Sequence, residues 1–371
     1  MKKLDKNKLA LAIAAPLLAV VAAVLITSLI ILATGDDPLL AYQVMLEFGS
    51  KSDSQVWIID KSITYYLSAL AVAIGFRMNL FNIGVDGQYR IAAFFAAVVG
   101  GALTLPGFLQ IPVIILVAMT VGALWAGIAG LLKVTRGVSE VITTIMLNFT
   151  AGSLIGYFLQ EGRLAEKDGN IFHTPNIPES SHFFTFPTTP DPVDGFIVIA
   201  VLVGAVYWFV LNRTRFGFDL RAVGSSQSAA EASGVSVKRM VLTSMVLSGA
   251  AAGLVGMPTL LGDSYNYGND FPTGIGFTGI ALALLGRNHA VGMAFAALLW
   301  GFLDRTGSQL EIEGFAQEIV EVMKGVIVLS VVIAYELVRR YGLRKQQREV
   351  GAELAAQSAG DGTNDKAGVS A

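Results

Sequence analysis

The sequence predicts an all-α polytopic membrane protein with about ten transmembrane helices. Of its 371 residues, 54% are hydrophobic and only 15% are charged, and the mean hydropathy is +0.62. A soluble globular domain carries roughly 25% charged residues. Apolar runs near the ~20 residues that a helix needs to cross a bilayer recur along the chain. We place the spans at 9–33, 62–76, 87–105, 111–133, 138–159, 194–212, 239–261, 271–286, 289–303 and 316–338.

The basic residues predict the orientation of these spans. With the N-terminus in the cytoplasm, most lysines and arginines fall on the cytoplasmic side, as the positive-inside rule requires. The apolar run 9–33 exceeds the roughly 7–15 residues of a signal-peptide core, so we expect a retained first helix. Helices one to five then end outside and helices six to ten begin outside. This arrangement is compatible with two inverted five-helix halves.

Two segments are predicted to lie outside the membrane, leaving residues 1–343 as the transmembrane domain. The stretch 160–195 is polar and rich in proline, and we expect an external loop that packs as a cap or faces a partner. Residues 344–371 are rich in Gly, Ala, Ser, Asp and Gln without an apolar period. We expect this tail to be a disordered cytoplasmic segment.

Composition and missing motifs exclude several functions. The chain has no cysteine, and its three histidines are scattered, so we expect no metal site and no other cofactor. Its net charge of −2 implies no nucleic-acid partner. It contains no GxxxxGK[ST] phosphate loop. If transport uses ATP, another chain must therefore hydrolyse it.

A polar, glycine-punctuated stretch from Gly75 to Ala93 lies between two apolar runs. Irregular polar backbone at membrane depth is tolerated where it is buried in protein or lines a water-filled cavity. Amide side chains can pair with the hydroxyls and ring nitrogens of a polar solute. The alternative is an ordinary cytoplasmic turn. Our candidates to line or support a translocation path are Asn79, Asn82, Asp86 and Gln88, with Asn148 on the fifth helix.

The basic loop 213–238 is the second candidate region. Ser225 or Ser226 can cap a short helix through Ser233, and Gly234 can end it. Such a helix under the membrane is what a motor subunit would grip. A solvated basic loop is the alternative.

Three glycines, Gly249, Gly253 and Gly256, give one helix a small-residue face. Small residues let helices approach closely in lipid, so we interpret them as packing residues. In the last helix, Glu321 and Lys324 can pair, which lowers the cost of burying them.

Taken together, these motifs resemble the permease subunits of bacterial ABC importers of the branched-chain amino acid, ribose and nucleoside group. The form Asn-Leu-Phe-Asn-Ile-Gly-Val-Asp-Gly-Gln at 79–88 looks like the nucleoside (simple sugar) type, and the Asp-Leu-Ser-Val-Gly of the ribose-type branch is absent. The stretches 247–253 and 279–289 are similar to the family as well. The family's ATPase-contacting segment matches at Gly217, Arg221, Ala222, Val223, Gly224, Ala229, Ala230 and Gly234.

This resemblance implies a subunit of an ATP-driven importer of nucleosides or related simple sugars in the bacterial cell membrane. It makes the 213–238 loop the ATPase-coupling site. It also implies an ATPase with two nucleotide-binding domains, a second and non-identical permease, and an extracellular lipid-anchored solute-binding protein. An ion-driven secondary transporter remains an alternative, as does an intramembrane enzyme or a non-transporting scaffold. No catalytic constellation supports the enzyme.

Overall fold

A computed structural model describes residues 6–169, 171–316 and 318–364. The chain divides into two units, one of residues 1–40 and 315–371 and one of residues 41–314. Helix α2 (Pro38–Gly49) runs across the boundary between them in the sequence. Each unit is described by itself.

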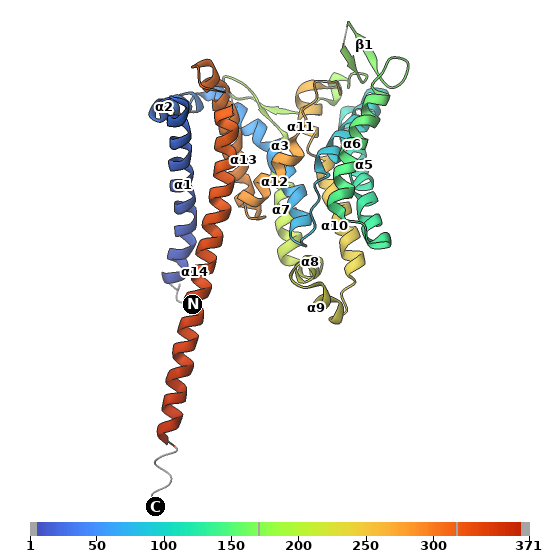
Figure 1. The fold of residues 1–371 in the computed structure, drawn as a ribbon. Helices are drawn as coiled ribbons and strands as arrows, with labels where there is room; N and C mark the ends of the chain where they lie inside the picture. Colours follow the sequence, from blue (N-terminus) through green and yellow to red (C-terminus); the bar gives the residue numbers. More distant parts are fainter. Residues whose placement is uncertain (1–5, 170, 317, 365–371) are drawn as a thin grey trace, which may run out of the picture. The chain divides into compact units, whose positions relative to one another are not determined.

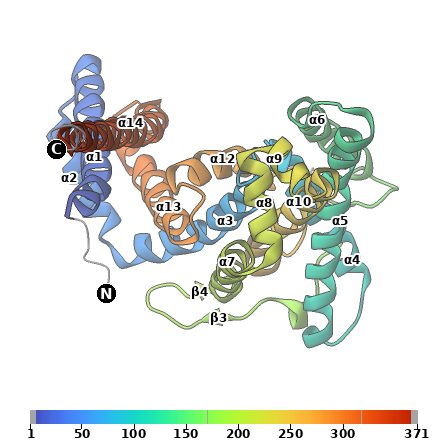
Figure 2. The same ribbon diagram turned by 90° about the horizontal axis from the view of Figure 1, so that it is seen from below.

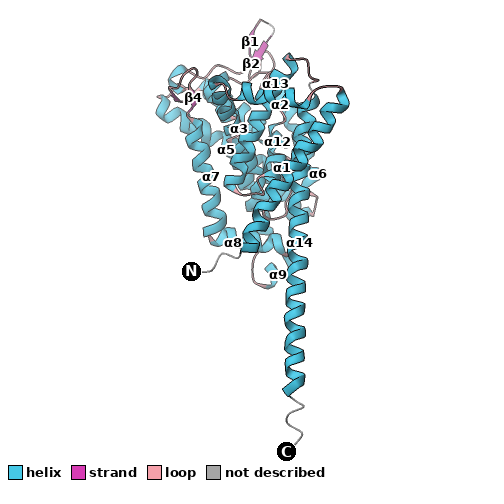
Figure 3. Ribbon diagram, turned by 90° about the vertical axis from the view of Figure 1, so that its left-hand side faces the viewer, coloured by secondary structure: helices cyan, strands magenta, loops and turns pink. Residues whose placement is uncertain are grey.

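The larger unit consists of helices with a few short strands near one end (Figures 1 and 3). Its helices are α3 (Ser52–Phe76), α4 (Val85–Ala102), α5 (Gly107–Arg136), α6 (Glu140–Phe158), α7 (Phe196–Arg213), α8 (Arg215–Ser225), α9 (Gln227–Ala232), α10 (Val237–Gly253), α11 (Met257–Thr259), α12 (Ile275–Leu285) and α13 (Ala290–Ile312). A π-helical turn, η2 (Leu260–Ser264), follows α11.

The expected spans correspond to helices, which confirms the all-α class. Every one of the ten stretches overlaps a helix, and α2, α8 and α9 lie outside all of them. Among the described residues, five helices are long and apolar enough to cross a membrane singly, and a pair broken after Thr34 makes a sixth. The number of ten spans therefore stays a prediction.

Helices α3 and α10 form the centre of the larger unit. Two thirds of the apolar window of each is buried, against 22% for α5 and for α6. Seen from below, α10 lies between α3 and the group formed by α4, α5 and α6 (Figure 2). Small side chains make this centre possible, because Ser68, Ala69, Ala71 and Ala73 of α3 are all buried.

The polar stretch 160–195 folds into small elements packed on neighbouring backbone. Strands β1 (Glu166–Asp168) and β2 (Ile171–His173) pair antiparallel, as do β3 (Thr185–Phe186) and β4 (Val193–Asp194), and a 3₁₀ turn, η1 (Glu179–Ser181), lies between the pairs. The N–H groups of Thr174 and Ile177 donate to the carbonyls of Tyr267 and Tyr265. The stretch is thus attached to the segment after η2.

The smaller unit pairs α1 (Lys6–Thr34) with α14 (Glu318–Asn364). Ala19, Ala23 and Thr27 lie four residues apart on one face of α1 and are buried. Lys324 of α14 is buried and its Nζ lies 2.5 Å from Glu321 Oε1.

The predicted tail differs from the structure. Residues 344–364 continue α14, whereas we expected disorder from 344, and 365–371 lie outside the described residues. The physical reason is local, because Ala, Glu, Gln, Lys and Arg favour helix and the segment carries on a helix already formed.

Candidate translocation and coupling site

The chain turns back on itself directly after α3. The N–H of Leu80 donates to the carbonyl of Gly75, and a Cβ at Gly75 would lie only 2.8 Å from the Leu80 carbonyl oxygen. Asn79 adopts a positive φ of 55° at this turn. Asparagine tolerates the left-handed region better than most residues, which explains its place here.

Asn82 and Gln88 lie opposite each other across the start of α4 and bond reciprocally. Asn82 Nδ2 donates to Gln88 Oε1 at 2.9 Å, and Gln88 Nε2 donates to Asn82 Oδ1 at 2.8 Å. Asn82 Nδ2 also donates to Ser248 Oγ, which donates to the Ala71 carbonyl. The two amide side chains are 0% and 1% exposed. This network joins α3, α4 and α10.

Asn148 attaches α6 to the same turn. Its Oδ1 accepts from the N–H of Gly87 at 2.8 Å, and its Nδ2 donates to the Ile83 carbonyl at 2.9 Å. The first N–H groups of a helix have no partner within the helix, so a side-chain acceptor from α6 satisfies one of those of α4. A Cβ at Gly87 would lie 2.8 Å from Asn148 Cα, which explains the glycine.

Asp86 joins the first turn of α4 to the first turn of α12. The Gly276 N–H donates to Asp86 Oδ1 at 3.3 Å, and a carboxylate is favourable at a helix N-terminus. Arg90 Nη1 lies 3.9 Å from Asp86 Oδ2. Arg90 Nε is buried without a partner among the described residues. Tyr89 donates to the Pro272 carbonyl, so α4 also bonds to the loop before α12.

The short helices α8 and α9 lie at the end of the larger unit away from the strands (Figure 1). Thr214 caps α8 by accepting from the Gly217 N–H. Ser226 caps α9 by accepting from the Ala229 N–H, and Gly234 follows with a φ of 84°. The expected short helix and its Ser226 cap are therefore present. Ala229 is exposed, whereas Ala230 is buried.

The α8–α9 segment touches the turn after α3 through backbone. Asn79 Nδ2 donates to the Gly224 carbonyl at 2.7 Å. A Cβ at Gly224 would lie 2.5 Å from the Arg77 carbonyl oxygen, so only glycine allows this approach. Arg77 donates to the Asn288 carbonyl at 2.6 Å, and Tyr207 Oη donates to the same oxygen at 2.7 Å. One turn thus connects α8 with the loop between α12 and α13.

The three packing glycines lie against other helices. A Cβ at Gly249 would meet the Gly122 carbonyl oxygen at 2.3 Å, and one at Gly253 would meet that of Ala118 at 2.2 Å. Gly256 lies against Ala93 of α4. Backbone approach of α10 to α5 at this distance has the character of small-residue packing in membranes.

Sequence reasoning did not single out Ser248, Tyr207, Asn288 or Gly276, although each bonds to a predicted site residue or to its turn. Ser248 and Asn288 lie in the motif stretches 247–253 and 279–289, and this was the only sign in the sequence that they belong to the site. Arg221 of α8 is half-buried, with Nη1 unpartnered among the described residues. No cluster of potential metal ligands occurs in the described part of the chain. The site residues hold helices and loops together.

Several helices long and apolar enough to cross a membrane, joined by bonded polar turns, place the chain in the class of multi-pass helical membrane proteins. The chain belongs to the branched-chain amino acid transport system / permease component family, whose model matches residues 56–332.

Individual relatives cover most of the chain. It is 36% identical to the guanosine ABC transporter permease protein NupP of Bacillus subtilis, over 87% of this chain and 93% of that protein. It is 31% identical to the glucose permease protein TsgB13 of Haloferax volcanii, over 89% and 90% respectively. It is 31% identical to the nucleoside permease protein NupB of Lactococcus lactis, over 86% and 90%. No solved structure matches the chain.

Proposed function

We propose that this chain is the transmembrane permease subunit of an ATP-driven importer that carries nucleosides into the cell. The observation that carries the coupling part is the contact of Gly224 with the turn at 77–79. Two of the three relatives named above are nucleoside permeases, which supports a nucleoside rather than a simple sugar.

The contact suggests how force reaches the membrane helices. A push on α9 acts on α8, and α8 touches the backbone at Arg77. The same turn continues into Asn82, which bonds to α4 and α10. Because packed helices rearrange between discrete states, a shift of this turn would switch the helices around it between inward-open and outward-open arrangements.

The five polar path candidates would then support the wall of the translocation path. Asn82 and Gln88 are buried and satisfied by each other, and Asn148 is bonded to backbone. In this conformation they support the path rather than offer free groups to a solute. Asp86 and Arg90 lie next to them and are the charged groups that a rearrangement would uncover.

The proposal includes partners and an orientation. A separate ATPase with two nucleotide-binding domains would bind α8 and α9 and use ATP, while this chain binds no cofactor. A second, non-identical permease would complete the pathway, and a lipid-anchored binding protein would deliver the nucleoside from outside. The protein would lie in a bacterial plasma membrane. Both termini would be on the cytoplasmic side, as would α8 and α9.

Reconstitution of the chain with its candidate ATPase, second permease and binding protein tests this function. We expect a panel of nucleosides to stimulate ATP hydrolysis and uptake, and simple sugars to stimulate them less. Stimulation by glucose alone would reassign the solute. Uptake by the isolated chain that is indifferent to ATP and collapses with an ionophore would establish the ion-driven alternative.

A further inference from the structure

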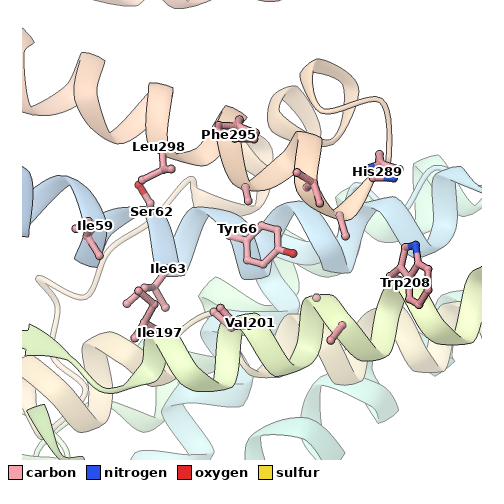
Figure 4. A pocket seen from close by; sticks show the side chains of 16 residues that line it. Ile59, Ser62, Ile63, Tyr66, Ile197, Val201, Trp208, His289, Phe295 and Leu298 are labelled. Carbon is pink, nitrogen blue, oxygen red and sulfur yellow. The ribbon is translucent and has the colours of Figure 1, made fainter. Parts of the chain in front are cut away.

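We propose that the groove between α3, α7 and α13 binds an anionic phospholipid, with one acyl chain along the groove and the phosphate at its Trp208–His289 end. The groove has a volume of about 810 Å³ and lies wholly within the larger unit. Figure 4 shows α3 as its floor, with side chains of α7 and α13 on either side. The membrane surrounding such a protein supplies the occupant.

The lining favours a hydrocarbon chain. Ile63, Val201, Phe295 and Leu298 line the groove with apolar side chains, and Val201 and Phe295 are 64% and 69% exposed. The Ser62 hydroxyl is bonded to the backbone of Ile58 and Ala297, so it offers little polarity to an occupant. An apolar lining of this kind is suited to contact with the methylene groups of an acyl chain.

The floor of the groove is kept open by a small residue. A Cβ at Gly204 would lie 2.0 Å from Tyr66 Oη, so a side chain at residue 204 would displace the end of the tyrosine side chain, which lines the groove. Ala205 and Ala294 also line the groove with small side chains. A larger residue at either position would fill the space that we assign to the acyl chain.

One end of the groove is positively charged. Trp208 and His289 lie there together (Figure 4). The Arg213 guanidinium carbon lies 5.5 Å from the Trp208 ring, and the side chain of Arg287 is exposed two residues before His289. Helix α7 contains no acidic residue, and the first on α13 is Asp304.

Charge complementarity therefore commits the occupant to an anionic headgroup. Tryptophan is enriched where headgroups meet hydrocarbon, and arginine binds phosphate bidentately. A phosphate bound by Arg213 beside Trp208 would place its acyl chain along the groove. A zwitterionic lipid would gain less from the same arginine.

Native mass spectrometry of the full-length chain, delipidated and then titrated with phosphatidylglycerol or phosphatidylcholine, tests the site. We expect one tightly bound phosphatidylglycerol per chain and at least tenfold weaker binding of phosphatidylcholine. Ala205→Phe should weaken phosphatidylglycerol binding at least tenfold by filling the groove. Val206→Phe is the matched control, because Val206 is exposed on α7 and does not line the groove.

The headgroup end is tested separately. Arg213→Gln should reduce phosphatidylglycerol binding several-fold and narrow its advantage over phosphatidylcholine. Arg239→Gln, an exposed arginine at the start of α10, should leave both unchanged. This variant pair keeps the test valid if Ala205→Phe does not fold.

Three results would overturn the proposal. Equal binding of phosphatidylglycerol and phosphatidylcholine would show that the site does not select an anionic headgroup. Unchanged binding in both Ala205→Phe and Arg213→Gln would show that the lipid binds elsewhere. The chain has no cysteine, so Ala205→Cys provides a clean cross-linking probe. A disulfide-linked pair of chains through Cys at this position would show that a second copy occupies the groove instead of lipid.

Discussion

The side-chain amide of Asn79 donates to the backbone carbonyl of Gly224 at 2.7 Å, although the two residues lie 145 positions apart in the chain. The bond joins the turn after α3 to the end of α8. Two further features hold the same contact, namely the positive φ of Asn79 and the missing side chain at Gly224. The proposed coupling to an ATPase rests on this bond between the turn after α3 and α8.

Gly224→Ala should weaken coupling. The added Cβ would lie 2.5 Å from the Arg77 carbonyl oxygen, so α8 must move away from the turn. We expect nucleoside-stimulated ATP hydrolysis to fall about tenfold, equivalent to roughly 1.4 kcal/mol of lost coupling. Gly325→Ala is the matched control, because nothing lies within 4 Å of a Cβ there. Equal stimulation in both variants would contradict the coupling role.

The Asn82–Gln88 pair should show strong thermodynamic coupling. Asn82→Ala leaves a buried Gln88 amide without its partner, which costs about 1–3 kcal/mol. The double variant with Gln88→Ala should cost less than the sum of the two single variants, because it removes both members. Unfolding of the four proteins in SDS-containing micelles measures this cycle. Additive costs would show that the pair does not act as a unit.

Gly253→Ala should destabilise the packing of α10 on α5. The new Cβ would lie 2.2 Å from the Ala118 carbonyl oxygen, and such overpacking typically costs about 1–3 kcal/mol. Gly127→Ala tests the same helix pair with an ordinary contact, since its Cβ would lie 3.6 Å from Val246 Cγ2. Thermal unfolding in detergent should separate the two variants, and similar midpoints would argue against tight packing at Gly253.

Stability should increase as the pH falls toward 5, because of Asp194. Burial raises the pKa of this carboxyl group to about 6; the Phe196 N–H partly opposes the shift, while Asp60 and Asp263 add to it. An aspartate in the unfolded chain titrates near ~3.9. Between these values the folded protein binds more protons than the unfolded chain, so lowering the pH favours the fold.

Asp194→Asn should flatten this pH dependence. Its matched control is Asp191→Asn, an exposed residue of the same segment. Unfolding midpoints measured between about pH 7.5 and pH 5 would show the wild-type midpoint rising more than that of Asp194→Asn. A wild-type midpoint that falls over this range would contradict the raised pKa of Asp194 in the folded protein.

The amino-acid sequence by itself determined the helical membrane class, the places of the long apolar helices and the short capped helix α9. These follow from local properties: hydrophobic runs set where helices lie, and the Ser226 cap and Gly234 are read within a few residues of chain. The family motifs also marked the turn at 79–88 and the loop 213–238 as the important polar regions.

Only the tertiary structure decided which groups these polar residues bond to. From the sequence, Asn82 and Gln88 were candidates to contact the solute. In the structure both are buried and bond to each other, and Asn82 also bonds to Ser248. The contact of Asn79 with Gly224 and the lipid-sized groove at Ala205 both depend on helices distant in sequence coming together. Hydrogen-bond satisfaction and close backbone approach are properties of the packed helices, and no local pattern along the chain specifies them.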